Sequence, residues 1–165
     1  MQTHHAYIGF GSNLGNRLEN CRNAVEALAK LPESSLLKTS SLYETSPIGL
    51  VEQPSFVNGA VLLQSAADAH RLLQQMLAIE RALGRIRTRK WGPRLIDLDI
   101  LFFDDQIIHS PGLTVPHPLL HERRFVLEPL KEIAPDFYHP ILGRTVAELL
   151  DELQDGDQRV EVLSI

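Results

Sequence analysis

The most constraining feature of the chain is an apolar run, Leu95–Phe103, interrupted only by Asp97 and Asp99. Leucine, isoleucine and phenylalanine around each carboxylate favour a buried strand over a helix or a loop. On a strand, residues i and i+2 share a face, so the two carboxylates should point the same way, about 6.6 Å apart along the backbone. The intervening residues should point the other way, into a core: Leu98, Ile100 and Phe102.

A basic stretch lies directly before this strand. Between positions 85 and 94 there are five cations and no acid: Arg85, Arg87, Arg89, Lys90 and Arg94. Two carboxylates on one apolar strand are costly unless cations neutralise them, so structural ion pairs are one reading of this pattern. The stretch nevertheless carries more positive charge than two carboxylates need. Mg²⁺ takes one or two carboxylates and completes its shell with substrate phosphates. The combination therefore predicts phosphoryl transfer, in which catalysis is mostly positioning and charge neutralisation.

Length and charge narrow the class of protein. The chain has 165 residues, which fits one domain over positions 1–165. Its formal net charge is −5, and outside the basic stretch 11 cations remain against 21 acids. An acidic body with one local basic stretch argues against a nucleic-acid partner and favours a focused site for a small anion.

Cysteine usage and hydropathy indicate the compartment. The single cysteine, Cys21, fits a reducing environment. No apolar run approaches the ~20 residues of a membrane helix, and no basic segment followed by an apolar one begins the chain. We therefore expect a cytoplasmic protein with no membrane partner. We also expect a monomer.

The order of the predicted elements indicates the fold class. Alternating segments predict strands at Ala6–Phe10, Leu36–Glu44, Phe56–Gln64 and 95–103. Caps and apolar stripes predict helices from Asn16 to about Lys30, from Asp68 to Leu83 with Gly84 at C′, over 119–134, and over Val146–Leu153 with Thr145 as cap. A short strand at Gln106–His109 and an extended segment at 113–118 lie between them.

This β-α-β-β-α-β order is the split βαβ, ferredoxin-like plan of an α+β protein with a mainly antiparallel sheet. The two early helices should cover one sheet face. The face with Asp97 and Asp99 should form a cleft partly walled by the late helices.

Two other kinds of site are disfavoured. Gly9-x-Gly11-x-x-x-Gly15 is one residue too long for a dinucleotide fingerprint, and no Gly-Lys-Ser/Thr follows it, so we expect a loop bordering the site. His117 and His121 have a ligand-like spacing, but no cysteine or third histidine lies close by, and Pro118 disfavours a ligand-bearing helix.

Several ordered motifs resemble those of one enzyme family, the 6-hydroxymethyl-7,8-dihydropterin pyrophosphokinases of folate biosynthesis. The central one is Lys90-Trp91-Gly92-Pro93-Arg94-Leu95-Ile96-Asp97-Leu98-Asp99-Ile100-Leu101. The others are Gly11-Ser12-Asn13-Leu14-Gly15, Thr45-x-Pro47-Ile48-Gly49, Gln53-Pro54-x-Phe56-x-Asn58 and Leu113-Thr114-Val115-Pro116-His117. The resemblance runs through Pro129 and implies a three-layer αβα sandwich around the ferredoxin-like core.

The resemblance also implies a reaction and a site. The reaction is transfer of pyrophosphate from ATP to the hydroxymethyl oxygen of the pterin, with release of AMP. Asp97 and Asp99 would hold two Mg²⁺ ions, and Arg85 and Arg94 would stabilise charge on the transferring group. The residues implied at ATP are Glu80, Arg87, Lys90, Trp91, Ile100, Thr114, His117 and Arg123. The residues implied at the pterin are Thr45, Pro47, Ile48, Phe56, Asn58 and Phe125.

The chain departs from the family pattern in places. Phe56 stands where many relatives have tyrosine, and Leu77 where some have glutamine. Gly112 replaces a basic residue, and Pro118 follows His117 where some have tyrosine. The basic stretch is one residue shorter than in some members, which weakens the placement of Lys90. These departures concern details of ATP contact.

Two other functions remain open at this point. An RNA-binding module of the same fold could use a basic loop, but it would need aromatic residues on adjacent central strands and a basic face. A non-catalytic pterin- or nucleotide-binding protein is the other possibility, although binding alone does not need two metal-bearing carboxylates.

Overall fold

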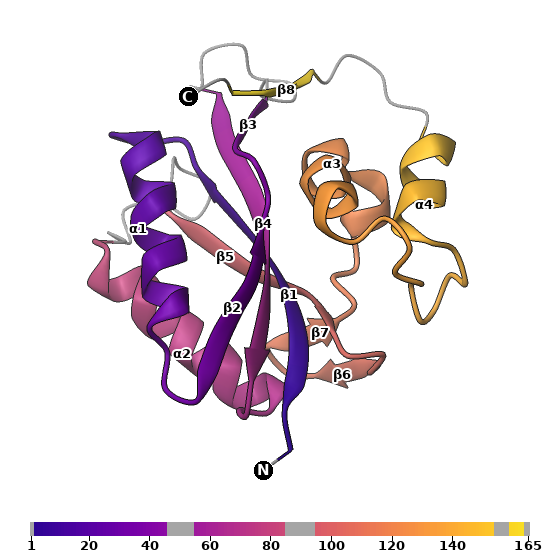
Figure 1. Ribbon diagram of the computed structural model, residues 1–165, viewed down its shortest axis with the longest axis horizontal. Coiled ribbons are helices and arrows are strands. Elements are labelled where there is room, and N and C mark those ends of the chain that lie inside the picture. Colours follow the sequence, from indigo (N-terminus) through magenta and orange to yellow (C-terminus); the bar gives the residue numbers. More distant parts are fainter. Residues whose placement is uncertain (1, 46–54, 85–94, 154–158, 164–165) are drawn as a thin grey trace.

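The fold is three layers, with a central sheet between two pairs of helices (Figure 1). The computed structural model describes residues 2–45, 55–84, 95–153 and 159–163. In Figure 1, α1 and α2 lie on one side of the sheet, and α3 and α4 lie on the other. The predicted α+β class and the αβα sandwich are confirmed.

The elements follow the predicted order. The strands are β1 (His4–Ser12), β2 (Ser34–Thr39), β3 (Tyr43–Thr45), β4 (Phe56–Ser65), β5 (Asp97–Phe103), β6 (Ile108–Ser110), β7 (Leu113–Val115) and β8 (Val160–Val162). The helices are α1 (Arg17–Ala29), α2 (Ala69–Ala82), α3 (Arg124–Ile133) and α4 (Val146–Glu152), with a 3-10 turn at Leu120–Glu122. No helix of the described ranges is long and apolar enough to span a membrane.

The large sheet has the strand order expected of a ferredoxin-like core. It runs β5-β1-β4-β3-β8, and β2 pairs with β4 beside β3, so β2 and β3 together occupy the place of one strand. Every pair of strands in the described ranges is antiparallel. The acidic strand β5 lies at one edge, next to β1.

Separate apolar cores cover the two sheet faces. The larger one joins the sheet to α1 and α2 and contains Ile8, Phe10, Leu28, Val61, Leu72, Met76 and Ile100. The other joins it to α3 and α4 and contains Leu101, Phe102, Leu120, Leu127, Leu130, Val146, Leu149 and Leu150. A third, smaller cluster, Ala60, Ile133 and Ala134, joins β4 to α3. Asp97 and Asp99 also face α3 and α4, because Leu98 and Ile100, which alternate with them, are in the core under α1 and α2.

The predicted caps of α1, α2 and α4 are confirmed. The side chains of Asn16, Asp68 and Thr145 each accept a bond from the backbone N–H three residues later. Thr145 and Glu148 form a complete capping box. Gly84 follows α2 with a φ of +93°, the left-handed conformation that glycine adopts at C′ without strain.

Some boundaries differ from the prediction. The strand predicted at Leu36–Glu44 is divided by Ser40, because its hydroxyl, rather than a strand backbone, receives the Ala60 N–H at 2.9 Å. β1 continues through Ser12, so Gly11 belongs to a strand and not to the predicted loop. The helix predicted over 119–134 is broken at Arg123, which has extended backbone. β8 was not predicted.

The prediction for Phe102 was wrong. The register of β1 with β5 shifts between Tyr7 and Ile8, so Leu101 is an extra residue in β5. A β-bulge of this kind reverses the alternation of side chains beyond it. Phe102 therefore packs with Leu101 in the core under α3 and α4, while Phe103 takes its place in the core under α1 and α2.

Candidate functional site

The centre of the site is a row of residues across three strands. In the sheet register Asn58 of β4 lies opposite Gly11 of β1, and Gly11 lies opposite Asp97 of β5. Directly paired residues of antiparallel strands project to the same face. Neighbouring strands are 4.7–4.9 Å apart, so Asn58 and Asp97 are about 10 Å apart at the backbone. Gly11 contributes no side chain between them.

Asp99 continues the acidic edge of this row. It lies opposite Gly9, two residues along β5 from Asp97. Asp97 is half-buried and Asp99 is exposed, so neither carboxylate is enclosed in an apolar core. Among the described residues, no group of three or more histidine, cysteine, aspartate or glutamate side chains could hold a metal. Two carboxylates alone fit Mg²⁺, because phosphate oxygens and water complete its shell.

Glu80 on α2 is hydrogen-bonded to the backbone of the acidic strand β5. It lies on α2 with 3% of its surface exposed, and its Oε2 accepts the backbone N–H of Leu98 at 2.8 Å. Leu98 lies between the two aspartates, and its N–H points away from β1 at the sheet edge. Glu80 therefore satisfies a donor that the edge strand would otherwise leave without a sheet partner.

His117 and Arg123 lie near the acidic strand. The backbone N–H of His117 donates to the Leu101 carbonyl at 3.0 Å, which ties this segment to β5. Burial lowers the pKa of His117, the Asp99 charge opposes that shift, and the Arg123 charge adds to it. Since Nδ1 accepts the Leu119 N–H at 3.3 Å, the neutral ring carries its proton on Nε2.

Phe125 is the half-buried aromatic residue at the start of α3. The Arg123 guanidinium carbon lies 5.6 Å from the centre of its ring, within cation–π range. The predicted ATP side and the predicted pterin side therefore meet at these two residues.

The opposite end of the row carries unsatisfied polar atoms. Thr45 is 2% exposed and Asn58 is 6% exposed. Within the described ranges, Thr45 Oγ1 and Asn58 Oδ1 are buried and have no hydrogen-bond partner. Buried polar atoms are normally paired, because leaving one unpaired costs about 1–3 kcal/mol. Phe56 lies opposite Thr45 and shares the face of Asn58. The two polar groups beside an aromatic residue fit the polar edge of a flat heteroaromatic ligand.

Ile100 and Thr114, both predicted to contact ATP, differ in the exposure of their side chains. The Ile100 side chain is in the core under α1 and α2, so only its backbone can reach a ligand. Like that of Leu98, this backbone faces the open edge of β5, because strand groups repeat every second residue. Thr114 is exposed at the middle of β7.

Several predicted site residues lie outside the described residues, and their predicted roles stay predictions. They are Pro47, Ile48, Arg85, Arg87, Lys90, Trp91 and Arg94.

The sequence interpretation missed the role of the β1 glycines. Gly9 and Gly11 lie on one face of β1, between the acidic and the polar ends, and the side chains of Leu101 and Asn58 come close to their backbone. A Cβ on Gly11 would come within 2.7 Å of Asn58 Nδ2, so the strand cannot carry a side chain here without displacing that amide. The signal was available, since glycines at i and i+2 of a strand mark a close approach on one face.

Comparisons with known proteins identify the family. Residues 7–135 match the family described as 7,8-dihydro-6-hydroxymethylpterin-pyrophosphokinase (HPPK). The chain is 44% identical over 157 residues to the 2-amino-4-hydroxy-6-hydroxymethyldihydropteridine pyrophosphokinase of Methylorubrum extorquens, covering 94% of this chain and 98% of that protein. It is 41% identical over 152 residues to the Synechocystis enzyme of the same name, covering 92% and 77%.

A solved structure shares the fold. The Plasmodium falciparum HPPK-DHPS crystal structure with pteroate superposes with a TM-score of 0.74 at 17% identity, covering 92% of this chain and 42% of that one. With the family match over most of its length, the chain belongs to the 7,8-dihydro-6-hydroxymethylpterin-pyrophosphokinase family.

Proposed function

We propose that this chain is a pyrophosphokinase of folate biosynthesis, which transfers pyrophosphate from ATP to the hydroxymethyl group of 6-hydroxymethyl-7,8-dihydropterin and releases AMP. The observation that carries the proposal is the row Asn58–Gly11–Asp97. In this row the carboxylate of Asp97 lies about 10 Å, at the backbone, from the buried amide of Asn58 on the same sheet face. That arrangement suits a reaction between a polyphosphate and a small heteroaromatic alcohol.

The pterin would bind at the polar end. Asn58 and Thr45 would pair with the donor and acceptor edge of the ring, which would satisfy their buried oxygens. Phe56 and Phe125 would contact the two ring faces, where offset aromatic stacking is favourable. Pro47 and Ile48 would complete this pocket.

The nucleotide would bind along the edge of β5. The backbone of Ile100, together with Thr114, is suited to the base and sugar, because it offers strand-like donors and acceptors at that edge. His117 and Arg123 would face the phosphates, with Arg87, Lys90 and Trp91 from the basic stretch. Glu80 would support this side by holding the Leu98 N–H.

Asp97 and Asp99 would hold two Mg²⁺ ions, which lower the charge repulsion of the triphosphate when they are bound. The cation-rich stretch would supply Arg85 and Arg94 to the group in transfer. The hydroxymethyl oxygen loses its proton to solvent and forms a bond to the β-phosphorus, while the bond from that phosphorus to the α,β-bridging oxygen breaks and AMP leaves. These arginines would stabilise the charge that spreads over the transferring oxygens.

The test is product formation with each component omitted in turn. AMP should appear only when ATP, Mg²⁺ and the pterin are all present, in an amount equal to the pyrophosphorylated pterin. ADP as product would contradict pyrophosphate transfer. AMP without pterin would indicate ATP hydrolysis, and binding of both ligands without AMP would indicate a non-catalytic protein.

A further inference from the structure

We infer that Glu132 on α3 and Arg17 on α1 are positioning residues, which hold β3 from opposite sides of the sheet and thereby set the geometry of the pterin pocket. The inference rests on the proposed function, because it takes Thr45 and Asn58 as pterin-binding residues.

The strand β3 needs such support because it is short. It has three residues, Tyr43–Thr45, and each pairs once with β4 and once with β8. β8 is itself three residues long and largely exposed. A three-residue ladder has few hydrogen bonds, so side-chain contacts from the helical layers contribute much of what locates Thr45.

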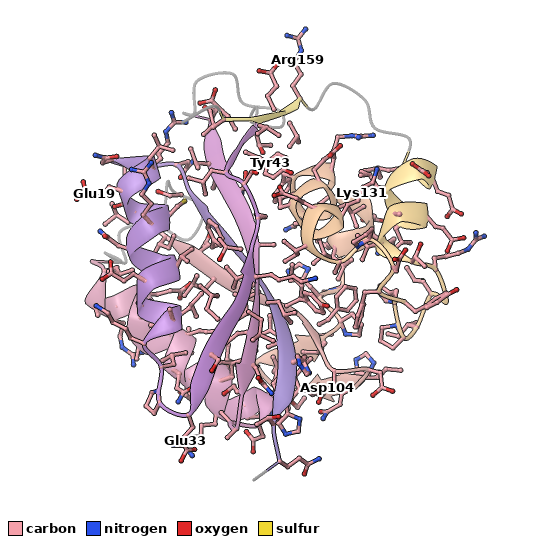
Figure 2. The ribbon with its side chains drawn as sticks, viewed as in Figure 1. Glu19, Glu33, Tyr43, Asp104, Lys131 and Arg159 are labelled. Carbon is pink, nitrogen blue, oxygen red and sulfur yellow. The ribbon has the colours of Figure 1, made fainter. Side chains whose placement is uncertain are left out.

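Glu132 holds β3 from the α3 side. Its carboxylate accepts the backbone N–H of Ser41 at 2.9 and 3.0 Å, the Ser41 hydroxyl at 3.0 Å and the Tyr43 hydroxyl at 2.6 Å. Tyr43 is 6% exposed and lies between β3 and α3 (Figure 2). Burial raises the pKa of Tyr43, and the Glu132 and Glu128 charges raise it further, so the hydroxyl keeps its proton and donates.

Arg17 holds the neighbouring backbone from the α1 side. Its Nη1 donates to the Ser55 carbonyl and to the Ser55 hydroxyl, both at 2.7 Å. Its Nη2 lies 3.2 Å from the Glu44 carboxylate, which also accepts the Ser55 hydroxyl at 3.1 Å. One guanidinium therefore joins the middle residue of β3 to the residue just before β4. It does so in the fork geometry that arginine provides and lysine does not.

The two contacts act on opposite faces because side chains alternate along a strand. Tyr43 faces α3, and Glu44 faces α1. Thr45 follows Glu44 directly and lies opposite Phe56, which follows Ser55. Tyr43 lies opposite Asn58. Loss of either contact therefore shifts residues that are adjacent to, or paired with, the pocket groups, while the acidic edge of β5 lies beyond β4 and β1.

Conservative variants test each side. Tyr43→Phe removes the bond to Glu132 but keeps the ring, and Arg17→Lys keeps the charge but loses the fork. Each should weaken pterin binding about three- to tenfold, because a bond to a charged group is lost and the pocket groups are misplaced. ATP affinity should stay within about twofold of the parent protein, since the α1 and α3 contacts do not reach β5. The double variant should be weaker than either single variant.

Two substitutions of Glu132 can be compared, one that keeps a hydrogen-bond acceptor and one that removes it. Glu132→Gln keeps an acceptor oxygen for Tyr43 and Ser41, so it should bind the pterin better than Glu132→Ala. Two controls separate positioning from general destabilisation. Lys30→Gln breaks an exposed ion pair elsewhere on α1, and Leu149→Ala truncates a buried side chain of α4. Both should leave pterin affinity unchanged, the second despite a lower melting temperature.

The measurement is pterin affinity by calorimetry, with a non-hydrolysable ATP analogue present, and ATP affinity measured separately. Unchanged pterin affinity in Tyr43→Phe and Arg17→Lys, with Asn58→Ala weakened, overturns this inference and leaves the proposed function standing. If Tyr43→Phe and Arg17→Lys weaken ATP binding as much as pterin binding, the inference is also overturned. If Asn58→Ala itself binds the pterin normally, the proposed pocket is wrong and the inference falls with it.

Discussion

The two faces of the central sheet are built from the same strands but differ in the side chains that they carry. Along β1, Ala6, Ile8 and Phe10 enter the core under α1 and α2 and are at most 3% exposed. Tyr7 and the glycines at 9 and 11 face the other way, toward α3 and α4. Each large apolar side chain on the first face contributes about 1.5–3 kcal/mol of burial. The second face gives up that burial at Gly9 and Gly11, and the side chains of Leu101 and Asn58 come close to the backbone there instead.

Because of this difference, we expect one face of the sheet to serve mainly stability and the other mainly binding. The sealed face, under α1 and α2, carries the larger apolar core. The open face, under α3 and α4, carries groups that the protein itself leaves incompletely satisfied, such as the oxygens of Thr45 and Asn58. Substitutions on the first face should therefore appear in stability, and substitutions on the second face in binding and turnover. The following predictions test that division.

The largest effect is expected at the acidic edge. Asp97→Ala and Asp99→Ala should each abolish turnover while the fold survives, because both side chains lie at the rim of the open face. Metal-assisted charge stabilisation is worth several kcal/mol, so kcat should fall by at least about a thousandfold. Steady-state assays with circular dichroism of each variant provide the measurement. Near-normal turnover of either variant at saturating Mg²⁺ would contradict the metal assignment.

A matched pair of glycines contrasts the two faces directly. On Gly11, a Cβ would come within 2.7 Å of Asn58 Nδ2, whereas on Gly59 it would run into the Phe10 ring. Gly11→Ala should therefore lower kcat/KM for the pterin by roughly tenfold to a hundredfold through a displaced pocket amide. Gly59→Ala should instead lower the free energy of unfolding by about 1–3 kcal/mol through overpacking.

Chemical denaturation and kinetics of both alanine variants check this contrast. The division between the faces is wrong if Gly59→Ala mainly changes pterin KM while Gly11→Ala mainly changes stability.

The sequence was informative wherever one local pattern determines the outcome. Alternation in β5 predicted that Asp97 would share a face with Asp99, and cap residues such as Asp68 and Thr145 marked helix starts correctly. These features depend on neighbours within a few positions, so a single sequence contains the information.

The features that the sequence did not predict depend on distant partners. The bulge at Leu101 exists only in relation to the register of β1. The bond from Tyr43 to Glu132 joins residues 89 positions apart, and no local pattern distinguishes that glutamate from a solvated one. The roles of Arg85 and Arg94 came from the resemblance to a family, since five cations in one stretch do not indicate which of them meets the phosphates.

A smaller effect is expected at the aromatic wall of the open face. Phe125→Ala should mainly weaken pterin binding, because the ring would contact the pterin equally before and during transfer. One lost aromatic stack is worth about 0.5–1.5 kcal/mol beyond area burial, which is roughly a three- to tenfold change in affinity.

Arg94→Ala, by contrast, should lower kcat by more than it raises KM, since its charge would matter most as pyrophosphate moves.

Steady-state kinetics of both variants, with pterin affinity measured separately, provide the check. The assigned roles would be reversed if Arg94→Ala changed only KM while Phe125→Ala changed only kcat.

The smallest effect is a pH dependence of stability that arises away from the site, in the loop between α3 and α4. His139 is 4% exposed, and its Nδ1 accepts the backbone N–H groups of Ile141 and Leu142 at 3.2 and 3.1 Å. Burial lowers the pKa of His139, and the His121 charge lowers it further. Since the unfolded chain has the ordinary pKa of about 6.5, it binds the proton at a higher pH than the folded protein does.

The stability from His139 is therefore fully present above about pH 6.5 and declines as the pH falls toward the lower folded pKa. Protonation of Nδ1 would also break both backbone bonds. His139→Asn should flatten this decline, because the amide oxygen can accept a bond in place of Nδ1 and does not titrate. The expected change in melting temperature between pH 7.5 and 5.5 is at most about 3 °C. His139→Asn should show less of it than the exposed control His109→Asn, and an equal pH dependence in the two variants would rule out His139 as its source.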